Sequence, residues 1–133
     1  MFAVTVRQEA DRTVVACSGE IDLMSTAELR TLIGEQIVEG HVHLVVDLAE
    51  VTFVDSSGLG VLVAARRKTR AFRGSLCLVV DHPAVLRVLH VTALDRVFPV
   101  HRTLAEALAA DPAVDTAGPV DPDAGSGLSR PAG

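Results

Sequence analysis

The sequence contains very few aromatic residues: four phenylalanines, no tryptophan and no tyrosine. Because hydrophobic residues still make up 49% of the chain, its core must be built from aliphatic side chains. Cysteine is equally scarce. Cys17 and Cys77 both lie in apolar, strand-like runs, so we expect two buried and reduced thiols. A disulfide scaffold or a zinc site would need more ligands, and we expect neither a metal nor a cofactor.

The sequence also lacks an excess of positive charge, a long apolar run and a leader pattern. Its formal net charge is −5, which argues against nucleic-acid binding through a general basic surface. No segment approaches the length of a membrane-spanning helix, and the polar residues at positions 7–12 do not fit a signal peptide. We therefore expect a cytoplasmic protein that does not associate with a membrane.

The length of 133 residues is enough for one domain with a single core. The composition changes after Ala110, since residues 111–133 hold four of the six prolines and four aspartates, without apolar periodicity. This pattern predicts one folded domain over residues 1–110. It also predicts a disordered, acidic tail, rich in proline, glycine and alanine, over residues 111–133.

Strand-like and helix-like patterns alternate along residues 2–110, which predicts an α/β domain. The chain should begin with an antiparallel hairpin and continue with a right-handed strand–helix–strand crossover. The spacing of Ser25 and Glu28 predicts a capping box, and Pro99 places the last strand at the sheet edge. We expect strands at 2–8, 13–18, 43–48, 75–80 and 96–100, a short turn after residue 48, and helices that begin near residues 25, 56, 83 and 103.

The stretch from Asp55 to Gly60 reads Asp-Ser-Ser-Gly-Leu-Gly and has the pattern of a helix start. Asp55 is a good N-cap, and a phosphate on a serine of the first turn would face free N–H groups and the positive end of the helix dipole. Taken alone, Ser56 and Ser57 could simply be capping or solvated hydroxyls. Two glycines that weaken the helix, and a position after a central strand, favour a functional site.

Other chemistries do not fit this stretch. Gly58-x-Gly60 is no dinucleotide fingerprint because position 63 is valine, and no Gly-Lys follows to make a phosphate-binding loop. Neither serine stands in a Gly-x-Ser-x-Gly motif, and the histidines show no motif. Asp47 could suggest an aspartyl phosphoacceptor, but the N-terminal region has no adjacent acidic pair to bind Mg²⁺.

Two further features have both a structural and a functional reading. Asp22 could be a loop carboxylate, which we favour on the residues alone, or a docking charge for a basic partner group. The other feature is a run of cations at the end of the second predicted helix. We favour a solvated helix end over a patch for an acidic partner, because cations suit a helix C-terminus. These cations are Arg66, Arg67, Lys68, Arg70 and Arg73.

The run from Asp47 to Val61, which includes Phe-Val-Asp-Ser-Ser-Gly-Leu-Gly-Val, closely resembles the signature of STAS domains of the anti-sigma factor antagonist type. The segment Gly19-Glu20-Ile21-Asp22 resembles the Gly-Glu-hydrophobic-Asp segment upstream of it in that family. The resemblance spans roughly residues 3–110. It implies a single domain with the STAS fold, a mixed four- to five-stranded sheet with about four helices.

The resemblance implies a regulatory binding protein and no enzyme. Its unphosphorylated form would bind an anti-sigma factor that is also a serine kinase, with ATP bound by that partner, and a sigma factor would be released. Phosphorylation of Ser56 would end the complex, and a phosphatase would reset it. The phosphosite neighbours would be Asp55, Ser57, Gly58, Leu59 and Gly60, and the partner-binding residues Asp22, Ile21 and Ser25.

Two alternatives remain open at this point. A STAS scaffold subunit of a stress-signalling or lipid-transport assembly would have the same fold without regulation by phosphorylation. A small enzyme could instead use Ser56 as a nucleophile, although the sequence offers no paired base.

Overall fold

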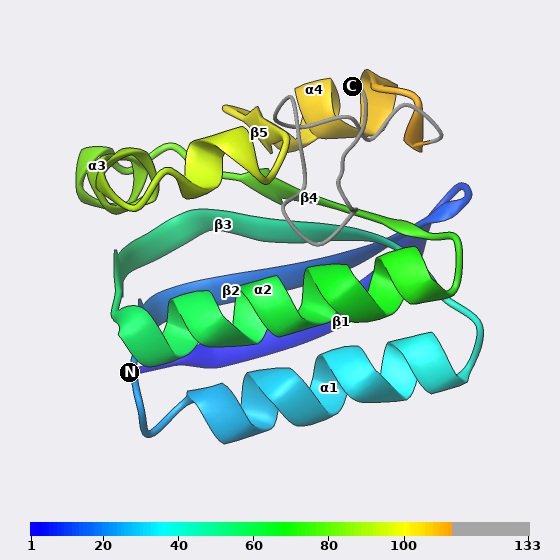
Figure 1. The fold of residues 1–133 in the computed structure, drawn as a ribbon, viewed down its shortest axis with the longest axis horizontal. Helices are drawn as coiled ribbons and strands as arrows, with labels where there is room; N and C mark the ends of the chain where they lie inside the picture. The colour runs from blue at the N-terminus through cyan, green and yellow to red at the C-terminus, as the bar shows by residue number, and fades with distance from the viewer. Residues whose placement is uncertain (113–133) are drawn as a thin grey trace, which may run out of the picture.

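The computed structural model describes residues 1–112 and shows one mixed sheet with helices on both faces (Figure 1). The strand order is β1-β2-β3-β4-β5, with β1 antiparallel to β2 and the other neighbours parallel. This confirms the predicted mixed α/β fold. Residues 113–133, which hold most of the predicted tail, lie outside the described residues. The elements are β1 Ala3–Glu9, β2 Arg12–Ile21, α1 Thr26–Val38, β3 His43–Val54, α2 Ser56–Ala71, β4 Ser75–Val79, α3 Pro83–Val91, the 3₁₀ helix η1 Leu94–Arg96, β5 Val100–His101 and α4 Leu104–Ala109.

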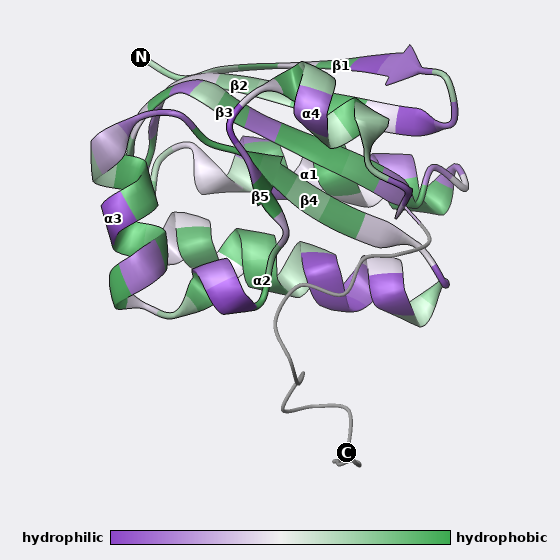
Figure 2. Ribbon diagram, turned by 90° about the horizontal axis from the view of Figure 1, so that it is seen from above, coloured by the Kyte–Doolittle hydropathy of each residue, from purple (hydrophilic) through white to green (hydrophobic). Residues whose placement is uncertain are grey.

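The sheet buries both of its faces around the central strand β3. Successive strand residues point to opposite faces, so Val15 and Val46 pack in the larger core under α1, α2 and α3. Val14 and Val45 pack on the other face, against Ala107 of α4. The middle strands are accordingly hydrophobic along most of their length (Figure 2). Within residues 1–112, no helix combines the length and the apolar character needed to cross a bilayer.

Strand β3 is longer than predicted, because the turn expected after residue 48 does not form. The strand continues to Val54 and pairs with a similarly extended β2, whose last residue, Ile21, lies opposite Val54. The register between the two strands shifts between Ala16 and Ser18 and again between Gly19 and Glu20, and the pairing resumes after each irregularity. The backbone hydrogen bonds of β2 therefore outweigh the turn-like composition of the segment.

The capping box predicted at Ser25 and Glu28 is absent. Ser25 precedes α1, but its side chain makes no cap hydrogen bond to the helix. Its hydroxyl instead accepts a hydrogen bond from the Asp22 amide at 2.9 Å. A serine hydroxyl at this position can bond either to the backbone of the preceding loop or to the first turn of the helix. In this structure it bonds to the loop.

The C-terminal third of the domain differs from expectation mainly in its last strand. The strand predicted over 96–100 is mostly absent, because Arg96 ends η1 and β5 begins only at Val100, beyond Pro99, and is two residues long. Its position at the sheet edge is as predicted. The last helix begins near residue 103 as predicted, and Thr103 caps it, since its side chain accepts a hydrogen bond from the Glu106 amide at 3.1 Å.

Arg12 joins the N-terminal hairpin to the C-terminal helix. Its side chain is buried, with the residue only 5% exposed. One guanidinium nitrogen donates to the carbonyl of Ala107 at 3.1 Å, and the other donates to the carbonyl of Ala110. Carbonyls at a helix C-terminus have no partner within the helix and favour a cation. Arg12 thus holds α4 against the sheet.

Neither Cys17 nor Cys77 forms a disulfide. Burial raises the pKa of Cys17 to about 12, and the negative charge of Asp47 adds to the effect. Cys17 therefore stays protonated and unreactive at neutral pH. Cys77 is only partly buried, so the prediction of two buried thiols is correct for Cys17 and too strong for Cys77.

Candidate functional site

The ends of β2 and β3 bring the two predicted acidic residues together. Because Ile21 pairs with Val54 in a parallel register, the residues that follow them, Asp22 and Asp55, leave the same edge of the sheet. The Asp55 amide also donates to the Ile21 carbonyl at 3.0 Å. The carboxyl ends of parallel strands are where α/β folds place their ligands. This edge, at the left of Figure 1, is the candidate site.

Asp55 caps α2 as predicted. Its Oδ1 accepts hydrogen bonds from the Gly58 amide at 3.0 Å and from the Ser57 hydroxyl at 2.5 Å. Ser57 is half-buried and committed to this contact, whereas Ser56 is exposed in the first turn of the helix. The two serines are therefore not equivalent. Only Ser56 presents a hydroxyl to solvent without an intramolecular bond.

Gly58 fits tightly against the core. A Cβ atom at this position would lie 2.7 Å from Ile21 Cγ2 and 2.9 Å from Val54 Cγ1. These two residues end β2 and β3, so the lack of a side chain at Gly58 lets α2 start directly on the strand ends. Gly60 is different, because a Cβ atom there would meet nothing within 4 Å. The packing of this chain explains Gly58 and does not explain Gly60.

The pKa of the Asp55 carboxyl is held below its ordinary value of 3.8, mainly by the hydrogen bond from the Ser57 side chain and then by the one from the Gly58 amide. A pKa lowered by folding means that the ionised form stabilises the fold. That contribution is complete above the ordinary value and is lost as the pH falls through the lower, folded-state pKa.

We therefore expect Asp55→Asn to change the acid end of the pH–stability curve. Asparagine is also a good N-cap, so the fold should persist at neutral pH. The urea midpoint of the wild type should exceed that of the variant by a constant amount above about pH 5, and the difference should shrink below about pH 4. Urea titrations of both proteins over this range test the assignment. A difference that grows on acidification would contradict it.

Asp22 and Ser25 shape the loop before α1. The Asp22 carboxylate accepts from the amides of Met24 at 3.0 Å and Ser25 at 3.2 Å, which fixes the loop backbone. Asp22 is half-buried and Ser25 is buried, at 7% exposure. Ile21 is fully buried under Gly58, so its side chain cannot contact a partner in this structure. Ile21 supports the site, and of the three predicted docking residues Asp22 is the most accessible.

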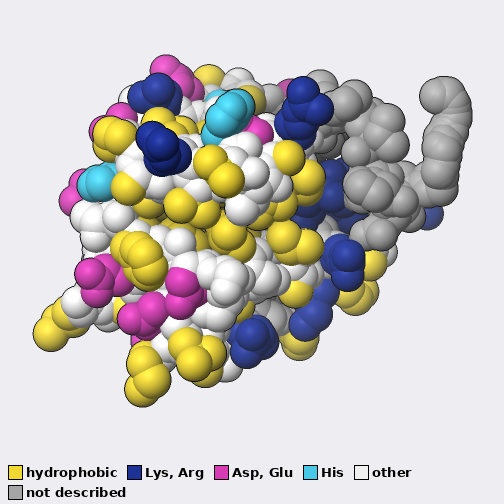
Figure 3. Space-filling model, turned by 60° about the vertical axis from the view of Figure 1, so that its left-hand side comes forward, with side chains coloured by type: hydrophobic (Ala, Val, Ile, Leu, Met, Phe, Trp, Pro, Cys, Tyr) yellow, Lys and Arg dark blue, Asp and Glu magenta, His cyan; other side chains and the backbone are white. Residues whose placement is uncertain are grey.

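Exposed hydrophobic side chains surround the acidic pair. Leu23 is 72% exposed, Met24 is 88% exposed and Phe53 is 50% exposed. Figure 3 shows hydrophobic and acidic side chains intermingled on this end of the molecule. Contiguous apolar exposure next to a functional residue marks an interaction surface. We call Asp22, Leu23, Met24, Phe53 and Ser56 the switch face.

The sequence reasoning missed the hydrophobic part of the switch face. One signal was available, since Leu23 and Met24 precede the first helix and lie outside its apolar periodicity. Phe53 and Val54 form an apolar pair in the sequence, and the pair alone does not say which of the two is buried. In a two-residue period only one of such neighbours can point inward, and Val54 is the buried one.

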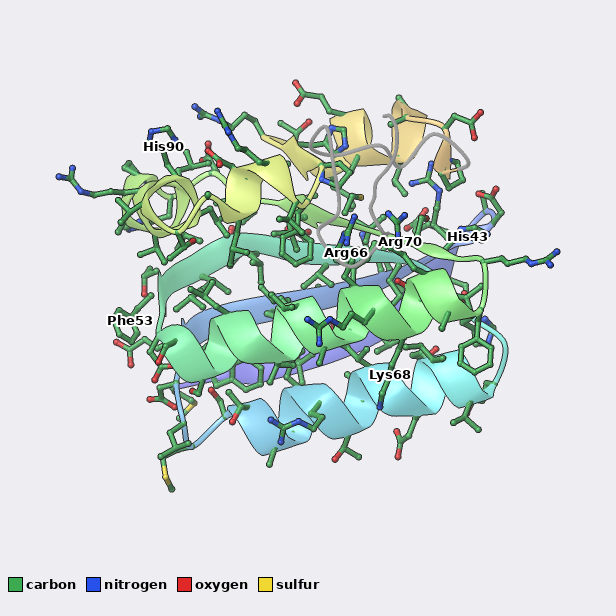
Figure 4. The ribbon with its side chains drawn as sticks, in the orientation of Figure 1. His43, Phe53, Arg66, Lys68, Arg70 and His90 are labelled. Carbon is green, nitrogen blue, oxygen red and sulfur yellow. The ribbon has the colours of Figure 1, made fainter. Side chains whose placement is uncertain are left out.

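The cations of α2 do not form a single cluster. Arg66 is buried, at 4% exposure, so the reading of a solvated helix end is wrong for this residue. Arg67, Lys68 and Arg70 are exposed. Figure 4 shows Lys68 pointing from α2 towards α1, whereas Arg66 and Arg70 leave the opposite side of the helix.

No histidine within residues 1–112 bonds to either serine. His43 Nδ1 lies 3.0 Å from Ser75 Oγ, His82 Nδ1 accepts from the Ala84 amide, and His90 Nδ1 lies 3.0 Å from Asp95. His82 thus caps α3. The described chain offers Ser56 no general base of the kind a nucleophilic serine requires.

Comparison with protein families gives a match to the STAS domain over residues 2–107. The matched region covers almost the whole described domain, including both strand ends and α2.

Individual relatives agree with this match. The chain is 34% identical over 107 residues to an anti-sigma-F factor antagonist, RsfB, of Mycobacterium tuberculosis, covering 80% of this chain and 87% of the relative. It is 26% identical over 99 residues to the anti-sigma-B factor antagonist of Listeria monocytogenes, covering 74% of this chain and 87% of that protein. The crystal structure of an anti-sigma factor antagonist from Mycobacterium paratuberculosis superposes with a TM-score of 0.74 at 33% identity, covering 82% of this chain and 92% of that one. All three relatives are named as anti-sigma factor antagonists.

Proposed function

The chain belongs to the STAS domain family, among the anti-sigma factor antagonists, and we propose that it works as a phosphorylation-controlled partner switch. Its unphosphorylated form binds an anti-sigma factor that is also a serine kinase, and a sigma factor is released. The kinase, with its own bound ATP, then phosphorylates Ser56 and the complex dissociates. A phosphatase resets the switch. The protein is a kinase substrate and no enzyme, and it acts in the cytoplasm with its partners.

One observation carries the proposal: the difference between the two adjacent serines. Ser57 is tied to Asp55 at 2.5 Å, whereas Ser56 is exposed and lies among the apolar side chains of the switch face. A hydroxyl that must enter the active site of a kinase needs this accessibility. The surrounding Leu23, Met24 and Phe53 supply apolar area that a partner could bury.

An unphosphorylated STAS scaffold would have the same fold, but it would not explain the exposed serine or the aspartate that caps the helix beside it. A scaffold needs neither an accessible serine nor a capping aspartate beside it. The enzyme alternative lacks a base near Ser56 in the described part of the chain. The switch therefore accounts for more of the site than either alternative.

The test is phosphate mapping. The full chain is incubated with ATP and with each kinase-type anti-sigma factor of the same cell, and intact mass and peptide fragmentation locate any phosphate. We expect a single phosphate on Ser56 with one of these kinases. It should be absent from Ser56→Ala and unchanged in Ser57→Ala, because Ser57 only supports the cap.

The two serine variants separate the outcomes. Phosphate on Ser57, or retained in Ser56→Ala, would contradict the assignment of the acceptor. An unmodified protein with every kinase would move the function to the scaffold reading. Labelling of Ser56 by a serine-directed phosphonate would instead support an enzyme.

A further inference from the structure

A groove between α1 and α2 begins close to the switch face. It has a volume of about 190 Å³ and is lined by Arg30, Ile33, Gly34, Val61, Ala64, Ala65 and Lys68. Ile33, Val61 and Ala65 form a buried apolar floor. An engineered cavity of about 150 Å³ binds benzene, so the groove has room for at least one aliphatic or aromatic side chain.

A row of exposed residues on α2 connects Ser56 with the groove. Residues four apart are neighbours on a helix, and Ser56, Gly60, Ala64 and Lys68 follow at this spacing, all exposed. At 3.6 residues per turn each step turns about 40° around the helix, so the row winds from Ser56 towards the groove. With a rise of 1.5 Å per residue, Ala64 lies about 12 Å and Lys68 about 18 Å along the helix from Ser56. A partner seated on Ser56 would thus have to follow α2 around its axis as well as along it to reach the groove.

Two glycines in or beside this row have no role in the packing of the chain itself. A Cβ atom at Gly34 or at Gly60 would meet nothing within 4 Å. Neither glycine has a positive φ that would require it. Each weakens its helix relative to alanine. Gly34 lies in the groove and Gly60 lies between the groove and Ser56, so both leave space that another molecule could fill.

The ends of the groove are basic. Arg30 and Lys68 are exposed, and neither makes a hydrogen bond or ion pair within residues 1–112. Lys68 points across the groove towards α1 (Figure 4). An apolar floor between two available cations is complementary to an apolar side chain flanked by carboxylates. The charge argues against a basic segment or a second copy presenting its own Arg30 and Lys68.

We propose that the α1–α2 groove is a second contact for the anti-sigma factor kinase and receives an acidic segment with a central apolar side chain. This inference rests on the proposed function, since it extends the footprint of the same partner. Phosphorylation of Ser56 would weaken the contact at the switch face. The contact in the groove would add affinity and specificity for the partner whether or not Ser56 carries a phosphate.

Two variants test the groove, each with its own control variant. Gly34→Leu fills it, and Thr31→Leu adds the same side chain to the exposed side of α1, outside the lining. The double change Arg30→Glu and Lys68→Glu reverses its charge. Arg96→Glu in η1 makes a charge reversal at an exposed residue outside the groove. Calorimetric titration with the kinase that phosphorylates Ser56 should show affinity reduced at least tenfold by both groove variants and within twofold of wild type for both controls.

The outcomes separate this inference from the proposed function. Groove variants that bind and become phosphorylated like the wild type would overturn the groove contact and leave the switch intact. A wild-type chain that binds no kinase-type anti-sigma factor would overturn both. Sedimentation measurements complete the set, because groove variants that change only the oligomeric state would assign the groove to a second copy of this chain and overturn the inference.

Discussion

Phosphorylation of Ser56 is expected to weaken binding to the anti-sigma factor kinase by about a thousandfold, which corresponds to about 4 kcal/mol. The phosphate adds a charge of about −1.5 to −2 next to Asp55, which is held in its ionised form, and close to Asp22. It also brings a hydrated anion into a face whose remaining surface is apolar. Burying it without a cationic partner is costly.

The fold of the phosphoprotein should not change. The helix dipole stabilises a phosphate at the first turn by only about 0.3–2 kcal/mol. Gly58 and the strand ends beneath it are packed and leave little freedom. Calorimetry with the separated phospho and unphosphorylated forms measures the loss, and Ser56→Asp should show a smaller loss of at least tenfold. Ser56→Ala should bind permanently. Equal affinity of both forms would disprove the switch, and globally altered solution spectra would disprove the local mechanism.

Replacing Gly74 with alanine is expected to destabilise the fold by about 2–4 kcal/mol, from overpacking of about 1–3 kcal/mol and a weakened hydrogen bond of about 1 kcal/mol. A Cβ atom here would lie 2.0 Å from the Val42 carbonyl oxygen and 2.6 Å from Val42 Cβ. The next residue, Ser75, donates its amide to that same carbonyl at 2.9 Å. The clash is with backbone, so it can be relieved only by moving the start of β4 away from β3.

Gly34→Ala is the matched control for this prediction. The added methyl group meets nothing within 4 Å, and alanine favours a helix over glycine. This variant should be more stable than the wild type by about 0.4–1 kcal/mol. Urea unfolding of the three proteins should therefore place the wild type between the variants. A Gly74→Ala protein as stable as the wild type would show that the contact with Val42 does not constrain the chain.

The sequence was sufficient for those parts of the site that depend on neighbouring residues. The cap at Asp55 needs only the backbone of the next helical turn, and it forms as predicted. The corresponding cap predicted at Ser25 does not form, because the Ser25 hydroxyl accepts a hydrogen bond from the amide of Asp22, three residues earlier. Competition between two local geometries of similar energy is decided by the rest of the fold, here by the path of the chain from β2 into α1.

Features that depend on pairing between distant segments were harder to predict. The last residues of β3 count as strand because β2 lies beside them, which no property of residues 49–53 reveals. Ile21 could be assigned to the neighbourhood of the site, but its complete burial follows from the approach of Gly58. The family resemblance gave the correct fold, whereas the exposure of Leu23, Met24 and Phe53 required the structure.

The contact between Arg12 and the end of α4 determines where anything attached to the C-terminal side of the domain would sit. Arg12 precedes Thr13, which pairs with Leu44 near the start of β3, whereas Ser56 lies two residues beyond the end of that strand. Leu44 and Val54 are ten steps apart along the strand, which is about 33 Å at the usual strand rise. A fluorophore, an affinity handle or a fused protein placed after Ala110 would thus leave the molecule at the edge opposite the phosphoacceptor. Labelled or tethered versions of the chain should keep the switch face open to a kinase.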